Sequence, residues 1–164
     1  MLVNQIQKCI DNGDSLDLID HIQRHLCEVV DSSGVSSLSK ERRVVYCVAL
    51  YDILTNNAGY KSIFTGSYTE IVRYLVGSLK DIGLEECSKS FQSAIDVVFT
   101  DRIPEELSLF EDMVEQSIER DCDGDPFDQF EEPFWDMSSD NEDEIYNKLA
   151  YYVKDNVESF KDIL

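Results

Sequence analysis

Basic side chains are scarce in this sequence, which has 14 lysines and arginines against 34 aspartates and glutamates and a formal net charge of −20. So negative a protein repels the phosphates of nucleic acids and of anionic lipids, and it attracts basic partners. We therefore expect that the protein binds neither nucleic acid nor membrane directly. Long apolar runs are also lacking, because no stretch approaches the roughly 18 residues of a membrane span. The first residues turn polar too early for a signal peptide.

Paired cysteines and a third histidine are absent as well. The five cysteines are odd in number and widely spaced, without a CxxC pair, which predicts reduced thiols and a cytoplasmic protein. His21 and His25 have the spacing of a helical metal pair, but Ile22 stands where the HExxH motif has its catalytic glutamate. This pattern is more consistent with two surface histidines. Because a nucleophile would have so few possible bases, we predict no catalytic residue, no enzyme activity, no cofactor and no metal site.

The negative charge lies almost entirely in the second part of the chain. Residues 1–95 carry 9 bases and 12 acids, whereas residues 96–164 carry 5 bases and 22 acids. Acidic residues that serve only solubility would be spread over the whole chain. Their concentration predicts a binding surface, mainly within residues 96–164, and a solvated charged face without a partner is the alternative.

Helical periodicity dominates the sequence. Apolar residues recur three and four positions apart in each long segment, and no segment alternates as a strand does. Ser39 is an expected N-cap of a central helix, and Pro104 is an expected start of a later one. The pattern predicts an all-α fold, with one single-domain helical bundle over residues 1–164 and short connections. The expected helices cover residues 2–10, 15–32, 40–57, 68–82, 87–99, 104–118 and 139–160.

An acidic loop is expected before the last helix. Residues 121–136 contain two prolines and one glycine, and such residues predict irregular structure. Ser139 and Glu142 are three residues apart and form a possible capping box at the start of the last helix. We expect the loop to be held against the fold by four aromatic residues, Phe127, Phe130, Phe134 and Trp135.

The run from Glu111 to Glu144 contains 15 acidic residues in 34 and a single base, Arg120. Glu111, Glu115 and Glu119 are spaced four apart, so they project from one helix face at about 6 Å per step. Each like-charge pair opposes folding by roughly 0.2–0.5 kcal/mol. A sequence that breaks such a local rule commonly does so for function.

These carboxylates match duplex DNA in number, since 15 negative charges correspond to about 25 Å of duplex. Carboxylates on a folded scaffold can occupy Arg and Lys sites that bind phosphate, and added salt weakens such contacts. One helical row is too sparse, so the loop and the start of the last helix must add further rows. The expected phosphate-mimicking residues are Glu111, Asp112, Glu115, Glu119, Asp121, Asp123, Asp125, Asp128, Glu131, Glu132, Asp136, Asp140, Glu142 and Asp143.

A calcium loop is a competing interpretation of the same segment. Asp121, Asp123 and Asp125, together with Glu132, match positions 1, 3, 5 and 12 of an EF-hand loop. The register fails at position six, where Pro126 replaces the turn glycine. A calcium-responsive module therefore ranks last among the functions considered.

The segment Asn56–Phe64 stands between the helix VVYCVALYDILTNN and a helix that ends Asp81-Ile82-Gly83. This turn, with the aromatic residues that follow it, resembles the nineteen-kilodalton DNA-mimic protein family over roughly residues 38–130. Ala58 stands where that family has a glycine, and Ser62 where it commonly has a glutamine. The resemblance implies a helical domain and, as partner, a helix-turn-helix repressor whose operator DNA the mimic displaces.

Four side chains around this turn have two possible roles. They could line a binding groove, but aromatic residues after a tight turn are more typical of core packing. If these aromatic residues are exposed, they could form the contact of a homodimer. The four are Tyr60, Ile63, Phe64 and Tyr68.

The sequence thus predicts a DNA mimic that occupies the DNA-binding surface of a basic helix-turn-helix transcriptional repressor through clustered carboxylates and blocks operator binding. The alternative is an acidic immunity-type inhibitor, in which the same carboxylates would plug the active-site cleft of a cationic toxin enzyme.

Overall fold

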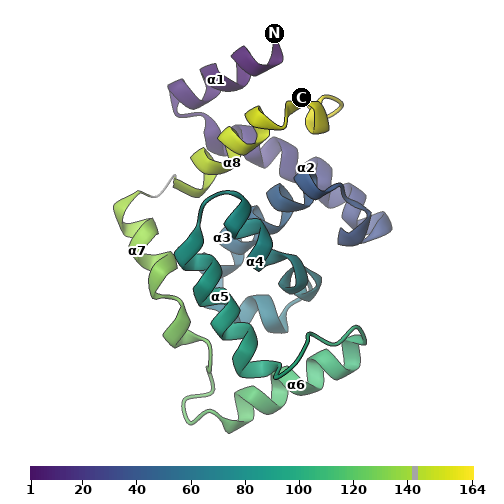
Figure 1. The fold of residues 1–164 in the computed structure, drawn as a ribbon, viewed down its shortest axis with the longest axis vertical. Helices are drawn as coiled ribbons and strands as arrows, with labels where there is room; N and C mark the ends of the chain where they lie inside the picture. Colours follow the sequence, from purple (N-terminus) through teal and green to yellow (C-terminus); the bar gives the residue numbers. More distant parts are fainter. Residues whose placement is uncertain (142–143) are drawn as a thin grey trace.

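The computed structural model describes residues 1–141 and 144–164, which form eight α-helices joined by short connections and contain no strand (Figure 1). The predicted all-α fold is therefore confirmed. None of these helices is both long enough and apolar enough to cross a lipid bilayer. The α-helices are α1 (Leu2–Asn12), α2 (Ser15–Ser33), α3 (Lys40–Thr65), α4 (Val72–Asp81), α5 (Glu85–Val98), α6 (Leu107–Arg120), α7 (Glu132–Asp140) and α8 (Glu144–Asp155). Four short 3-10 helices cover Val35–Ser37, Thr69–Ile71, Asp128–Phe130 and Val157–Phe160.

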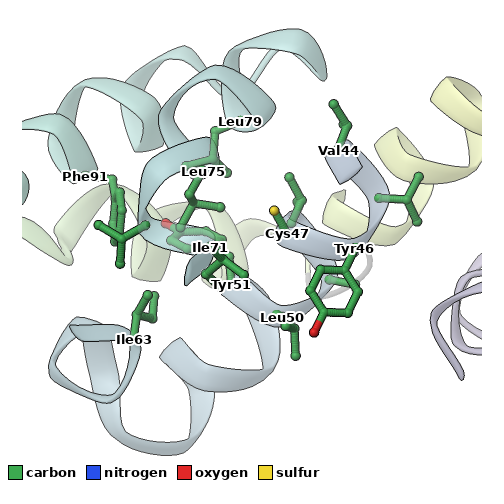
Figure 2. Packing of buried hydrophobic residues seen from close by; sticks show 14 of the residues in the cluster. Val44, Tyr46, Cys47, Leu50, Tyr51, Ile63, Ile71, Leu75, Leu79 and Phe91 are labelled. Atoms are coloured by element: carbon green, nitrogen blue, oxygen red, sulfur yellow. The ribbon is translucent and has the colours of Figure 1, made fainter. Parts of the chain in front are cut away.

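Helix α3 is the centre of the fold. Ser39 caps it as predicted, since its hydroxyl accepts the backbone N–H of Arg42 at 3.4 Å. Every residue from Val44 to Asp52 is buried, and a helix that is apolar around its whole circumference must be covered on all sides. Helices α2, α4 and α8 supply this cover. Figure 2 shows side chains of α3, among them Cys47 and Tyr51, among Leu75, Leu79 and Phe91 of the helices packed on it.

Aromatic rings connect this core to the acidic part of the chain. Phe64 of α3 stacks on Phe127 with ring centroids 4.3 Å apart, and Tyr51 meets Phe134 edge-on at 5.4 Å. Tyr60 and Phe64 are buried, as is Ile63, so the predicted core role of these turn residues is confirmed. Tyr68 is 43% exposed. Burial of the other two aromatic residues removes most of the reason for which a homodimer was considered.

Helix α3 continues beyond its expected end at Asn57, but it is kinked. Ala58 and Gly59 leave helical geometry, and Gly59 has φ 66° and ψ −171°, a conformation that is essentially restricted to glycine. A side chain at this position would also collide with the carboxylate of Glu131. The turn that carries the family resemblance is thus a kink against which the acidic segment packs.

Three expected helix starts are wrong. The helix expected from residue 68 is α4, which begins only at Val72 after the 3-10 helix Thr69–Ile71. Pro104 does not begin a helix, because it is buried and its carbonyl accepts the guanidinium of Arg73; α6 starts only at Leu107. Ser139 does not begin the last helix either, since it lies inside α7 and its hydroxyl donates to the Trp135 carbonyl at 2.7 Å. Pro133 stands in the first turn of α7, where proline is well tolerated. The acidic loop is therefore shorter than predicted, and Glu142 of the expected capping box lies outside the described residues.

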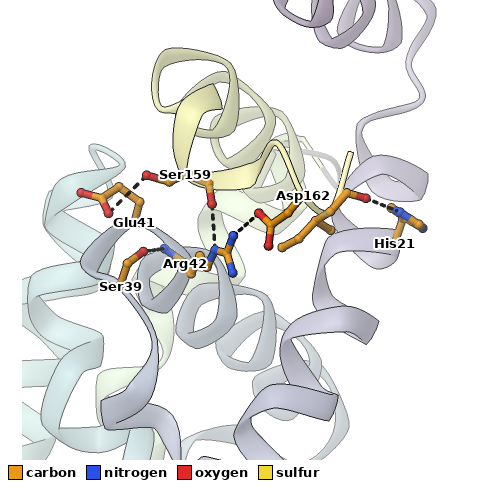
Figure 3. Close-up of polar contacts among 7 residues, drawn as sticks. His21, Ser39, Glu41, Arg42, Ser159 and Asp162 are labelled. Atoms are coloured by element: carbon orange, nitrogen blue, oxygen red, sulfur yellow. Dashed lines mark hydrogen bonds and ion pairs between the residues drawn. The ribbon is translucent and has the colours of Figure 1, made fainter.

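Polar contacts tie the last residues of the chain to α3 and α2 (Figure 3). The Arg42 guanidinium donates to the Ser159 carbonyl at 2.7 Å and forms an ion pair with Asp162. The exposed His21 places its Nε2 at 3.0 Å from the Ile163 carbonyl. Both chain ends lie at the end of the molecule opposite to α6 (Figure 1).

Replacement of Gly59 by alanine should destabilise the protein by at least about 2 kcal/mol, because the side chain adds backbone strain and meets Glu131. Gly77→Ala is the matched control: beyond the backbone of its own helix α4, the added methyl group meets no atom within 4 Å, so it should stabilise by roughly 0.5–1 kcal/mol. Urea unfolding monitored by circular dichroism measures both changes. Equal effects of the two substitutions would contradict the kink geometry.

Candidate partner-binding surface

The carboxylates of α6 form the predicted row. Glu111, Glu115 and Glu119 are all exposed, as is Asp112, while the opposite side of the helix buries Phe110 and Val114 against α5 and α3. The adjacent Arg120 donates to Gln116 at 3.4 Å. None of the ion pairs found among the described residues uses any of the predicted phosphate-mimicking carboxylates. The carboxylates of the row therefore still repel one another, and their charges remain accessible to a partner.

The acidic loop after α6 is ordered by its own carboxylates. Asp121 Oδ2 accepts the backbone N–H groups of Asp123 and Asp125, both at 3.1 Å, and Asp125 Oδ1 accepts that of Phe127 at 3.1 Å. Such side-chain contacts stabilise turns. Asp121 and Asp125 are half-buried, whereas Asp123 and Asp128 are exposed. The exposed pair is thus better placed than the half-buried pair to meet a partner.

The same contacts bear on the calcium interpretation. Asp121 and Asp125, which would be ligands at positions 1 and 5, direct oxygens to backbone N–H groups. Within residues 1–141 and 144–164, no group of three or more His, Cys, Asp or Glu side chains has an arrangement that could hold a metal ion.

Glu131 is buried, so its prediction as a phosphate-mimicking surface residue is wrong. Its side chain lies inside the fold at 5% exposure. Oε1 accepts the Tyr60 backbone N–H at 2.6 Å, and Oε2 accepts the Trp135 indole N–H at 3.1 Å. Phe127, Glu131 and Phe134 have the i, i+4, i+7 spacing of an apolar helical face. This pattern in the sequence could have predicted that Glu131 is buried, although only Phe134 of the three lies inside α7.

Helix α7 presents the remaining described acids. Glu132 and Asp136 are exposed on its outer side. Glu142 and Asp143 lie outside the described residues, as does the side chain of Asp140. Trp135 is predicted only to hold the loop against the fold, but it is 40% exposed. Its exposure follows from its place beside Glu132 on the solvent side of α7, which could not be known before the helix itself was found.

A cleft of about 470 Å³ lies between α5, α7 and the start of α8. Leu84, Pro133 and Met137 supply apolar surface, and burial raises the pKa of the Cys87 thiol in its wall, which keeps that thiol protonated at neutral pH. Three of the cleft carboxylates, those of Glu85, Glu86 and Glu144, are not among the predicted phosphate-mimicking residues. They stand in the first turns of α5 and α8, where the helix dipole stabilises negative charge. The cleft thus has an acidic rim of five carboxylates, Glu85, Glu86, Glu132, Asp136 and Glu144.

Glu131→Ala should destabilise the protein by about 2–4 kcal/mol, because two donors lose a charged acceptor. The adjacent Glu132→Ala is the matched control, and it should change stability by less than about 0.5 kcal/mol because its side chain is exposed. Urea unfolding followed by tryptophan emission measures both, since Trp135 is the sole tryptophan. A larger loss in the control would contradict the assignment.

Comparison with known proteins returned a family and no individual relative. No curated protein and no solved structure matched the chain. The sequence model of the family described as DMP19-like protein matches residues 36–156. This match spans α3, the Gly59 kink, α6, the acidic loop and α7, and it extends on both sides of the resemblance that the turn residues indicated. The chain belongs to the DMP19-like family, the DNA-mimic family predicted from its turn.

Proposed function

We propose that the protein is a DNA mimic that occupies the DNA-binding surface of a basic helix-turn-helix repressor and blocks its binding to operator DNA. The observation that carries this proposal is the row of exposed carboxylates on α6, which form no ion pair within the described part of the chain. Further exposed acids follow in the loop and in α7. Family membership supports it. The protein would act by competition, without chemistry of its own.

Charge density decides which residues take part. A single helical row places one charge per roughly 6 Å, whereas duplex DNA has one per about 1.7 Å of axis. Further rows must therefore contribute, and the remaining exposed acids of α6, of the acidic loop and of α7 are the candidates. They are Asp112, Asp123, Asp128, Glu132 and Asp136.

The ordered backbone of the acidic loop favours the binding of a partner. The loop is held by Phe127, which is fully buried, and by Lys61, whose ammonium donates to the Gly124 carbonyl at 2.7 Å. Because the backbone that carries the carboxylates is already ordered before a partner arrives, no entropy is lost on ordering the loop when the partner binds. Cations of the partner would also relieve the repulsion within the α6 row.

A second candidate is an immunity-type inhibitor of a cationic toxin enzyme. The observation that favours it is the position of α6 at one end of the long axis of the molecule (Figure 1), which would allow this helix to enter a cleft. We further propose a cytoplasmic location, because all five cysteines are free thiols, as is usual in a reducing compartment.

Neutralisation of Glu115, Glu119 and Asp123 by the amides Gln, Gln and Asn should weaken partner binding about tenfold and leave the fold intact, since all three are exposed. Host DNA-binding proteins held on duplex DNA-cellulose are first challenged with the wild-type protein, and the released proteins are identified by mass spectrometry. Release of the best candidate from its labelled operator is then followed by fluorescence anisotropy at several salt concentrations.

The matched control is Asp17→Asn, Glu28→Gln and Asp31→Asn, three exposed acids of α2, which change the net charge equally at another place. Release by this control, but not by the first variant, supports the proposal. Release that is weakened equally in both variants would mean that net charge alone acts. If the protein releases nothing but inhibits a cationic nuclease, the second candidate is favoured.

A further inference from the structure

Trp135 is an exposed aromatic residue held in a fixed orientation. Its indole N–H donates to Glu131 Oε2 at 3.1 Å, and its ring meets the Phe134 ring edge-on with centroids 4.9 Å apart. Phe134 and Phe127 of the same segment are fully buried, whereas Trp135 remains 40% exposed. The contact with Glu131 explains why position 135 has a side chain with an N–H donor, but it does not explain why part of the aromatic ring is exposed to solvent.

The surroundings of this ring select the type of ligand. Glu132 and Asp136, three positions before and one after it, are both exposed and without an ion pair among the described residues. The two cation–π contacts formed within the described chain use Tyr74 and Tyr151 and leave Trp135 without a cation. A negatively charged environment beside an exposed aromatic ring favours a cationic group.

The hydrogen bond to Glu131 strengthens this preference. Since the indole N–H is already bound to a carboxylate, the exposed part of the side chain offers its ring to a partner and no donor. A carboxylate on the N–H polarises the indole towards higher electron density, and a cation over the ring is attracted by the electrons of its face.

We propose that Trp135, together with Glu132 and Asp136, binds an arginine side chain of the basic partner. Arginine fits better than lysine because its planar guanidinium stacks on an indole while its N–H groups still reach carboxylates at the side. This inference rests on the proposed function, since it names the partner group that α7 recognises. It adds to the carboxylate surface a contact that depends less on ionic strength than charge pairing does.

The test uses hexa-arginine and hexa-lysine peptides as probes, with isothermal titration calorimetry of the whole protein. Trp135→Leu should weaken hexa-arginine binding by about 2- to 5-fold and hexa-lysine binding less. Tyr151→Leu is the matched control: this ring is similarly exposed, at 44%, but Lys154 already lies over it at 4.7 Å. The control should leave both affinities unchanged. Equal losses for the two peptides in Trp135→Leu, or no loss, would overturn the proposal.

A second measurement needs no variant, because Trp135 is the sole tryptophan. Bound hexa-arginine should shield the wild-type indole from acrylamide quenching more than bound hexa-lysine does. Unchanged quenching at peptide saturation would contradict the proposal. Quenching that falls as the protein concentration rises, without peptide, would also contradict it, because a second copy of the protein would then cover the ring. Neither peptide assay involves a repressor, so the arginine site can fail while operator release succeeds, and the reverse result is equally distinguishable.

Discussion

The Glu131 carboxylate holds the acidic segment against the rest of the fold. One of its oxygens binds the backbone of Tyr60 directly after the kink of α3, and the other binds Trp135 of α7. The kink brings the backbone of Gly59 against this carboxylate, so a side chain at position 59 would displace it. Loss of the carboxylate would in turn leave the Tyr60 backbone N–H without its acceptor. The position of α7, and with it that of the exposed Glu132 and Asp136, depends on this contact.

Buried aromatic packing allows so acidic a segment to fold. Phe110, Phe127 and Phe134 place large apolar side chains in the core at intervals along the segment. Burial of one such side chain stabilises by about 1.5–3 kcal/mol, which exceeds the roughly 0.2–0.5 kcal/mol lost at each like-charge pair. The segment can therefore keep its carboxylates unpaired on one side as long as the rings on the other side are buried. The aromatic side chains of the segment thus stabilise its fold, while different side chains of the same segment, the carboxylates, set its charge pattern.

Local signals in the sequence predicted much of the fold. The Ser39 cap, the central helix that follows it and the core role of Tyr60 and Phe64 all follow from nearest neighbours along the chain. The contrast between Glu131 and Glu132 does not, because these adjacent identical residues differ only through a contact with Tyr60, 71 positions away. Helix α7 was missed for a related reason: Pro133 reads as a helix breaker unless it is known to stand in the first turn. Among the candidate acids, the exposed row on α6 needed only helical periodicity, whereas the division between half-buried and exposed aspartates in the loop depends on how the loop closes on itself.

The contacts of Arg42 and His21 with the last residues place the C-terminus beside α2 and α3. Helix α1 packs on α8 and α2, so both chain ends lie far from α6 (Figure 1). A protein attached to a surface, or fused to a second protein, through either end would therefore point its acidic end outward. Any assembly joined at the termini would leave the carboxylate row of α6 free, because the points of attachment and this row lie at opposite ends of the molecule.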